Sequence, residues 1–330
     1  MMKILLLGLG RWGANHLRVL NSLPVELFVC DPQPKALEAA RKLGLPPERV
    51  SANSQDFAGL VDAAVVVTPA QSHFTLCRQF LEADKDVFVE KPITLVSGEA
   101  RALAELADRR RRVLQVGHIF RFDTATQWLK QAIAEGRFGR LQLLRSNFSG
   151  FKRPRSDSGI AFADAIHFID LFNHLLDSTP RRVTAVMRDF LERGPGFDDA
   201  TLLSLEYQTA AGPVWGVVET NYFLPGKFRD LTITGSDLSA VCDFNVAQYK
   251  IKTFANRHTR EGGQIQAVEG ALTQVECAPV EPLLAQLQAF LHSVKSRQAP
   301  SADGWAGFHT VRVLEAAFES ARSGRTVELT

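Results

Sequence analysis

The chain has 330 residues, of which 45% are hydrophobic and 22% charged, and its formal net charge is +2. This length allows two domains with separate hydrophobic cores, and the composition is that of an ordinary globular protein. The near-neutral charge gives no basic field of the kind that attracts nucleic acid or an anionic membrane surface. We therefore expect neither as a partner.

The cysteines and the N-terminus indicate a cytoplasmic protein. The four cysteines are widely scattered and show no CxxC or metal-type spacing, as in a reducing compartment. The apolar start of the chain is broken at Gly8, and Arg11 follows before a signal peptide could be complete. No apolar run approaches the length of a membrane span.

Short strands and helices alternate along the first 120 residues. Apolar runs predict strands at 3–7, 25–30, 63–67, 87–89 and 113–116. Helical patterns between them cover 11–20, 34–43, 72–83 and 97–109. This alternation predicts right-handed βαβ units in a doubly wound parallel sheet of the Rossmann type, the α/β part of the fold.

The pattern changes after Arg121. Helices are predicted at 124–135 and 160–176, with a strand at 141–148 between them. Several strands separated by turn signals follow from 183 to 254, which predicts a mainly antiparallel sheet. Helices at 282–296 and 306–323 end the chain. We therefore predict a Rossmann domain at 1–120 and an α+β domain at 121–330.

A G-x-G-x-x-G motif lies between the first predicted strand and helix, where it predicts dinucleotide binding. Gly8 can turn the chain tightly, Gly10 lets the backbone approach a pyrophosphate, and Gly13 lets the helix pack closely on the sheet. Arg11 and Trp12 belong to the same turn and are included in the candidate cofactor site. The phosphates would lie at the helix N-terminus, which favours anions.

Asp31 ends the second predicted strand, 21 residues after Gly10. A carboxylate there can accept hydrogen bonds from both adenosine ribose hydroxyls and would repel a 2′-phosphate. The next basic residue is Lys35, which follows an intervening Pro-Gln-Pro segment. The sequence thus favours NAD over NADP. A role of Asp31 as N-cap of the following helix is compatible with this assignment.

Two polar segments, Thr68-Pro69 and Glu90-Lys91-Pro92, follow successive predicted strands. Ligands of open α/β sheets bind outside the carboxyl ends of the strands, so both segments should face the nicotinamide half of the cofactor. A lysine beside a cationic nicotinamide should have a lowered pKa and could transfer the proton of a sugar-type hydroxyl. The alternative for Lys91 is an ordinary surface lysine before a loop proline.

Several motifs together resemble the glucose-fructose oxidoreductase, inositol dehydrogenase and MocA (Gfo/Idh/MocA) family over essentially the whole chain. They are Gly8–Gly13, Thr68-Pro69 with His73, Glu90-Lys91-Pro92, Val116-Gly117-His118 with Arg121-Phe122, Asp157–Leu171, Glu281-Pro282-Leu283 and Asp303-Gly304.

This resemblance implies an NAD-dependent oxidoreductase with a Rossmann domain and a large open antiparallel sheet. It implies cofactor contacts from Thr68, Pro69, His73, Glu90 and Lys91. It also implies that Lys91 transfers the proton and that His167 is its partner across the substrate. In this family the open sheet often forms subunit contacts, so we expect a homodimer or homotetramer built through residues 121–330.

Within the family, residues 116–122 and 157–160 look similar to members that act on nucleotide-linked sugars, and the nearest pattern is that of UDP-N-acetylglucosamine 3-dehydrogenases. Arg153 and Arg155 lie in a basic loop and would suit a diphosphate, because guanidinium groups bind phosphate oxygens in bidentate fashion. A solvated basic loop is the alternative. A free inositol or a cyclic diol is the other candidate substrate.

The chain departs from the family pattern at Ala163, where related enzymes commonly carry an aspartate four residues before the active-site histidine. Asp164 precedes His167 by three residues, and side chains at this spacing can meet on a helix. Two alternatives follow: Asp164 replaces the missing carboxylate, or it points elsewhere and His167 works alone with Lys91. A sensor that binds NAD without catalysis is therefore an alternative, although Glu90, Lys91 and His167 are retained.

Four further residues, His118, Arg121, Asp170 and His174, have more than one interpretation. His118 and Arg121 follow the strand at 113–116 and are candidate substrate-binding residues, but Arg121 could instead form an ion pair at the domain junction. Asp170 and His174 lie near one helical face with His167, as a metal site would require. No further Cys or His group lies nearby, so we expect pairing or packing and no metal.

Overall fold

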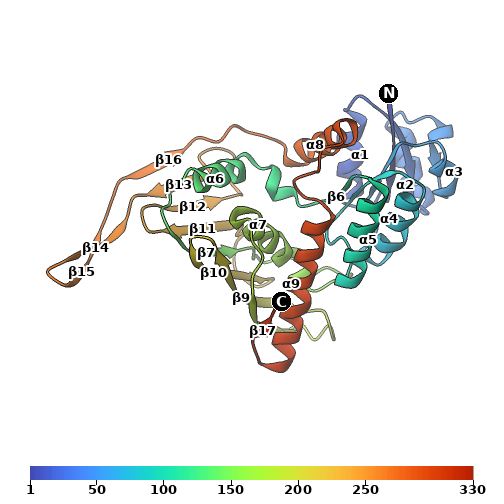
Figure 1. The fold of residues 1–330 in the computed structure, drawn as a ribbon. Helices are drawn as coiled ribbons and strands as arrows, with labels where there is room; N and C mark the ends of the chain where they lie inside the picture. The colour runs from blue at the N-terminus through green and yellow to red at the C-terminus, as the bar shows by residue number, and fades with distance from the viewer. Residues whose placement is uncertain (330) are drawn as a thin grey trace. The chain divides into compact units, whose positions relative to one another are not determined.

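The computed structural model describes residues 1–329, which form two compact units (Figure 1). The first unit comprises Met1–Ile119 and Glu281–Val311. The second comprises Phe120–Val280 and the chain from Arg312 onward. Each unit has its own hydrophobic core, as the length of the chain predicts. Within residues 1–329, no helix is long and apolar enough to cross a membrane.

The first unit contains a six-stranded sheet in which every neighbouring pair of strands is parallel. The strand order is β3-β2-β1-β4-β5-β6, which confirms the predicted doubly wound fold. The strands are β1 (Met2–Leu7), β2 (Val25–Cys30), β3 (Val50–Ser51), β4 (Ala63–Val66), β5 (Asp86–Val89) and β6 (Leu114–Val116). The helices between them are α1 (Gly13–Asn21), α2 (Pro34–Lys42), α3 (Gln55–Ala58), α4 (His73–Glu82) and α5 (Ser97–Arg110).

The apolar run of β1 is continuous because both faces of this sheet are covered. Ile4 and Leu6 belong to one hydrophobic cluster, whereas Leu5 and Leu7 belong to another. Successive side chains of a strand point to opposite faces, so the two clusters lie on opposite sides of the sheet. This double burial holds the carboxyl ends of the strands, where the glycine turn begins.

The predicted boundary of the second domain is corrected by helix α8 (Pro282–Ser296), which belongs to the first unit. Its apolar residues recur at helical spacing and are buried in the cluster on the α1 side of the parallel sheet. They are Leu283, Leu287, Phe290 and Val294. At the start of α9 (Gly304–Ser323), Phe308 and Val311 belong to the cluster on the other side. The sequence shows the apolar stripe of a helix but not which sheet it covers.

The second unit is built on a nine-stranded sheet in the order β16-β13-β12-β11-β7-β10-β9-β8-β17. All neighbouring pairs are antiparallel except β7 and β10, so the prediction of a mainly antiparallel sheet is confirmed. The strands are β7 (Leu141–Asn147), β8 (Arg182–Arg188), β9 (Ala200–Thr209), β10 (Gly212–Asn221), β11 (Asp230–Gly235), β12 (Ser239–Asp243), β13 (Ile251–Phe254), β16 (Leu272–Val275) and β17 (Val327–Glu328).

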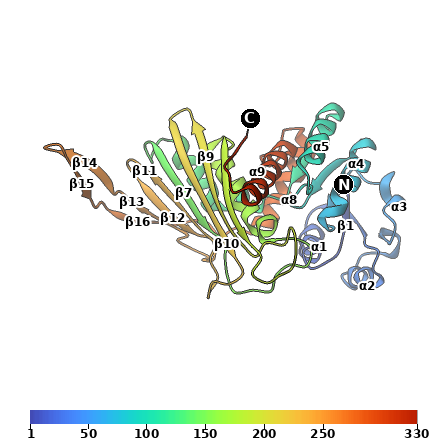
Figure 2. The same ribbon diagram turned by 90° about the horizontal axis from the view of Figure 1, so that it is seen from below.

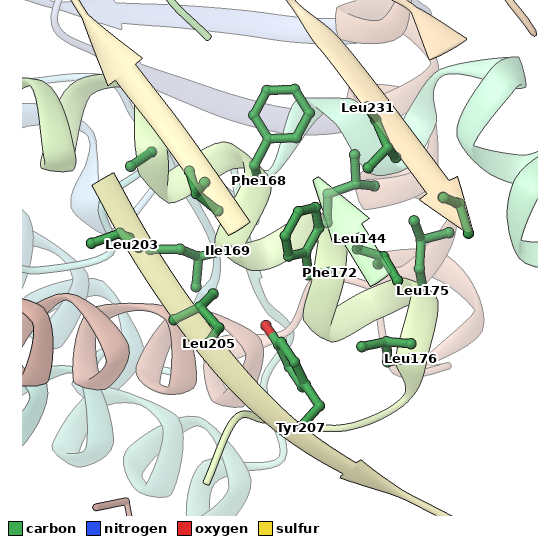
Figure 3. Packing of buried hydrophobic residues seen from close by; sticks show 14 of the residues in the cluster. Leu144, Phe168, Ile169, Phe172, Leu175, Leu176, Leu203, Leu205, Tyr207 and Leu231 are labelled. Atoms are coloured by element: carbon green, nitrogen blue, oxygen red, sulfur yellow. The ribbon is translucent and has the colours of Figure 1, made fainter. Parts of the chain in front are cut away.

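One face of this sheet packs on helices, and α7 (Ile166–Leu176) is central to that packing (Figure 3). Phe168 and Phe172 of α7 share a buried cluster with Leu203 and Leu205 of β9. Residues of α6 (Thr124–Ala134) and of the later turns of α9 complete this cluster. The core thus fixes the position of α7, which carries His167.

A long hairpin extends beyond the edge of the sheet (Figures 1 and 2). It consists of β14 (Arg257–Glu261) and β15 (Gln264–Val268), which pair only with each other. Gly262 and Gly263 connect the strands, both with positive φ, as the commonest two-residue hairpin turn requires. Nearly all of its side chains are exposed to solvent.

Replacing Phe290 with alanine should destabilise the first unit. The side chain is fully buried, and truncation of a buried phenylalanine costs about 3–5 kcal/mol. Hydrogen exchange should accelerate in β1, β2 and β4 and change little in β7, β9 and β10. Gln288→Ala, on the exposed side of α8, is the matched control. Equal acceleration in both sheets, or no acceleration, would contradict the assignment of α8 to the first unit.

Candidate functional site

The three glycines of the turn after β1 have different structural surroundings. Gly8 has a φ of 90°, and a Cβ there would lie 2.7 Å from the Val67 carbonyl oxygen. A Cβ on Gly13 would lie 2.1 Å from the carbonyl oxygen of Gly8. At Gly10, however, an added Cβ meets no atom of the described chain within 4 Å. The open space at Gly10 is the place where the backbone of a dinucleotide-binding turn approaches the pyrophosphate.

Asp31 is buried and holds the glycine turn. Its Oδ2 accepts a hydrogen bond from the Leu9 amide at 2.7 Å, and its Oδ1 accepts one from the Gln33 amide at 2.8 Å. The N-cap of α2 is Gln33, so the considered role of Asp31 as that cap is wrong. Each carboxylate oxygen can accept more than one hydrogen bond, and these contacts leave capacity for ribose hydroxyls.

Glu90 is a buried carboxylate that connects the end of β5 to the start of α1. Its Oε1 lies 2.8 Å from Trp12 Nε1 and 2.8 Å from His16 Nε2. Burial acts to raise the pKa of Glu90, but the His16 and Trp12 contacts and the charge of Lys91 outweigh it and hold this pKa below its usual value. An anionic Glu90 therefore lies next to Lys91.

His16 and Gly117 are parts of this arrangement that sequence reasoning missed. His16 is fully buried against Glu90. The one available signal is its spacing of four from Trp12, which places both on one side of α1. A Cβ on Gly117 would lie 2.8 Å from the Glu90 carboxylate, so this position requires glycine.

His73 joins the two polar segments that follow β4 and β5. Its Nδ1 lies 2.8 Å from the Pro92 carbonyl oxygen and its Nε2 lies 2.8 Å from that of Thr68. Burial lowers the pKa of His73, and the two carbonyls oppose that shift. With only 1% of its surface exposed, His73 positions the segments instead of presenting a surface to the cofactor. His118, directly beyond β6, is also buried.

His167 lies in the first turn of α7 against two aromatic rings. The Phe120 ring meets it edge-on at 5.1 Å between centroids, and the Phe148 ring is stacked on it at 5.7 Å. A π-helical turn, Ala161–Ala165, precedes α7, so the predicted continuous α-helix from residue 160 is wrong in its first turn. Such turns change the angular relation of neighbouring side chains and recur at functional sites.

The carboxylate of Asp164 lies in this π-helical turn and is engaged by Lys152. The Lys152 ammonium forms an ion pair with Asp164 Oδ2. Ala163, where relatives commonly carry an aspartate, is itself buried in the same turn. The role of Asp164 as the substitute partner of His167 stays a prediction, and the structure adds Lys152 to the residues around it.

The two loop arginines predicted to bind a diphosphate differ in their surroundings. Arg155 forms a bidentate pair with Asp157, with hydrogen bonds of 2.8 and 2.7 Å. This pairing raises the pKa of Arg155 and lowers that of Asp157. Arg153 is exposed to solvent. The charge of Arg155 is therefore balanced within its own loop.

Arg121 forms a buried ion pair with Asp170 of α7. Its Nε and Nη2 donate to the two carboxylate oxygens at 2.9 and 2.6 Å, and less than a tenth of either side chain is exposed. Burial and the nearby Arg121 charge lower the pKa of His174 to about 4. Within residues 1–329 no group of three His, Cys, Asp or Glu side chains is arranged to hold a metal ion. Asp170 therefore pairs with Arg121 within the second unit.

The parallel sheet with its glycine turn and the buried acid beside Lys91 define a dinucleotide-binding enzyme of the Rossmann class. A model of the oxidoreductase family with an NAD-binding Rossmann fold matches residues 2–118, and a model of its C-terminal alpha/beta domain matches residues 130–329. The chain belongs to this family, Gfo/Idh/MocA, and is an NAD-binding oxidoreductase.

Named relatives include dehydrogenases of inositols and of a nucleotide sugar. Inositol 2-dehydrogenase of Rhizobium meliloti is 32% identical over 63% of this chain and 65% of that enzyme. UDP-N-acetylglucosamine 3-dehydrogenase of Acidithiobacillus ferrooxidans is 28% identical over 78% and 77%. An oxidoreductase domain protein from Kribbella flavida superposes with a TM-score of 0.84 at 21% identity, over 100% and 99% of the chains, which shows the shared fold.

Removal of the Asp170 carboxylate should destabilise the second unit, because it leaves the Arg121 charge buried. The expected loss for Asp170→Ala is about 3–5 kcal/mol in denaturant unfolding. The double variant Arg121→Met with Asp170→Leu should recover most of this loss, because it removes both charges and fills the volume. If Asp170→Ala unfolds like the unmodified protein, the pair is not structural.

Proposed function

We propose that this protein transfers a hydride between NAD and a secondary hydroxyl or ketone of a sugar-type substrate. The observation that carries the proposal is the ionised, buried Glu90 that connects the glycine turn to Lys91. This carboxylate links the cofactor-binding segment to Lys91, the proposed proton-transfer residue of the first unit. When bound, NAD supplies the carbon that accepts or donates the hydride.

The residues of the first unit have separate tasks in this proposal. Gly8, Gly10 and Gly13, with the adjoining Arg11 and Trp12, would hold the pyrophosphate, and Asp31 would accept the ribose hydroxyls. The segments Thr68-Pro69 and Glu90-Lys91 would line the nicotinamide half, held in place by His73. The Lys91 ammonium would exchange a proton with the reacting hydroxyl, because it follows the carboxyl end of β5, the edge of the sheet at which the nicotinamide would bind.

His167 would assist from the substrate-binding domain. The resemblance to the family assigns it as the partner of Lys91 across the substrate. Its two aromatic neighbours, Phe120 and Phe148, support that role because they hold the imidazole in one orientation. A fixed orientation is what a proton-transfer group requires.

The named relatives support two candidate classes of substrate. The similarity to a UDP-N-acetylglucosamine 3-dehydrogenase supports a nucleotide-linked sugar, and the similarity to inositol dehydrogenases supports a free inositol or cyclic diol. With Arg155 paired to Asp157, Arg153 is the loop residue that would meet a diphosphate. His118 and Arg121 are more deeply buried than this loop and would act on the substrate only indirectly.

We also propose that the uncovered face of the nine-stranded sheet forms the contact between copies of this chain. Four large apolar side chains are exposed on strands β8, β9, β10 and β12, namely Val186, Leu202, Trp215 and Val241. Their positions alternate with core residues, so they lie on the face opposite the helices. An exposed apolar patch of this kind is typical of subunit interfaces.

Lys91→Ala should abolish turnover and leave NAD binding almost unchanged. Loss of a proton-transfer group typically lowers kcat by about 10²–10⁴-fold, whereas the glycine turn, which would hold the pyrophosphate, is not substituted. The measurements are NAD reduction with a panel of sugars, inositols and nucleotide sugars, and calorimetric titration with NAD. Lys42→Ala, at an exposed position of α2, is the matched control. Near-normal activity of Lys91→Ala would refute the mechanism.

Trp215→Asp should dissociate the oligomer. The side chain is 52% exposed in the isolated chain, and a carboxylate at this place would be buried without a partner in the contact. Light scattering coupled to size exclusion should show the mass of a single chain for this variant and a multiple of it for the unmodified protein. Leu60→Asp alters an equally exposed apolar residue of the first unit and should leave the mass unchanged.

A further inference from the structure

We propose that the substrate carries an anionic group, a carboxylate or a phosphate, and that Arg229 binds it together with Lys152 beside His167. This inference rests on the proposed function, because it takes His167 as the residue at the substrate. It differs from the prediction made from the sequence, which placed anion binding at Arg153 and Arg155. Arg229 is not part of any motif that the sequence displays.

Arg229 is a partly buried cation that lacks a polar partner. It directly precedes β11, and its guanidinium carbon lies 4.8 Å from the centre of the Phe148 ring. Its Nε is buried, and within residues 1–329 no hydrogen bond or ion pair to its side chain is formed. Burial lowers the pKa of Arg229, with the charge of Asp164 acting in the opposite direction.

The buried Nε–H of Arg229 is left without an acceptor among residues 1–329. A guanidinium has five N–H donors, and a buried donor without an acceptor is destabilising, more so when it is charged. The aromatic ring of Phe148 stabilises the positive charge but accepts no conventional hydrogen bond from these donors. An oxyanion would supply both the missing acceptors and the missing negative charge.

Lys152 adds a second cation at the same ring. Its ammonium lies 4.9 Å from the centre of Phe148 and forms the ion pair with Asp164. One carboxylate therefore faces two cations, Lys152 and Arg229, and a net positive charge is left. Because His167 is stacked on Phe148 as well, an anion bound by the two cations would lie next to the proposed site of proton transfer.

The other arginines near this place already have partners. Arg155 is paired with Asp157, and Arg121 with Asp170. Arg193 donates to the backbone carbonyls of residues 155, 197 and 198. Arg229 differs from all three in having its contact with an aromatic ring only, which makes it the arginine that requires an external acceptor.

The test measures binding to the NAD-loaded protein with matched sugars. The probes are D-glucose, D-glucuronate, D-glucose 6-phosphate and UDP-glucose, titrated by calorimetry. We expect at least one anionic probe to bind about tenfold or more tightly than glucose, since hydrogen bonds to charged groups contribute on this scale. The glucuronate and glucose 6-phosphate arms distinguish a carboxylate from a phosphate, and the UDP-glucose arm identifies a diphosphate.

Three variants test whether Arg229 causes the preference for an anionic probe over glucose. Arg229→Gln should remove the tenfold preference and leave glucose and NAD affinity unchanged, while Arg229→Lys should keep part of it because the charge is retained. Arg257→Gln is the matched control at an exposed position of the β14–β15 hairpin and should behave like the unmodified protein. Melting temperatures of all three verify that they fold.

Each remaining outcome decides between the two proposals. Equal binding of glucose and every anionic probe overturns the anion site, as does a preference that survives Arg229→Gln or that disappears in Arg257→Gln. NAD reduction, measured in parallel, tests the proposed function separately. An anion preference without hydride transfer to or from any substrate would count against catalysis alone, and hydride transfer that Arg229→Gln leaves unaltered would count against the anion site alone.

Discussion

The structure of the first unit depends on one buried negative charge, that of Glu90. A carboxylate removed from water is stable only if hydrogen bonds and opposite charge replace its hydration. Trp12 and His16 contact the carboxylate through their ring nitrogens, the Lys91 charge lies beside it, and Gly117 leaves the space that it occupies. The glycine turn, the end of β5 and the end of β6 are thereby held together around a single acid, and Lys91 follows directly on it.

In the second unit the arrangement of charges, and not the sheet, distinguishes the candidate site. The core built by α7 and β9 is apolar and would stabilise many related chains (Figure 3). Around His167, however, Arg121 and Arg155 are neutralised by neighbouring carboxylates, and Lys152 is matched by Asp164. The buried Nε of Arg229, in contrast, has no acceptor among residues 1–329. This difference is the basis of the proposed anion site.

Local patterns were sufficient to predict most elements of the fold. Continuous apolar runs such as Ile4–Leu7 indicate strands buried on both faces, and the glycine spacing after β1 has few structural explanations. The failures have a common cause in long-range packing. The apolar stripe of α8 is visible in the sequence, but its burial against the parallel sheet depends on contacts with residues more than 200 positions away. The π-helical turn before α7 likewise has no composition signal.

The sequence by itself determined the parallel sheet, the dinucleotide turn, Asp31 and the two polar strand ends, because each depends on neighbours within a few residues and on the period of the backbone. Only the tertiary structure decided which charges are paired. Asp164 is adjacent to Ala163 in the chain, yet it pairs with Lys152; Arg155 pairs within its loop, and the buried Nε of Arg229 has no hydrogen-bond partner among residues 1–329. An ion pair depends on the distance between two charged groups in space, and the separation of two residues along the chain does not determine that distance.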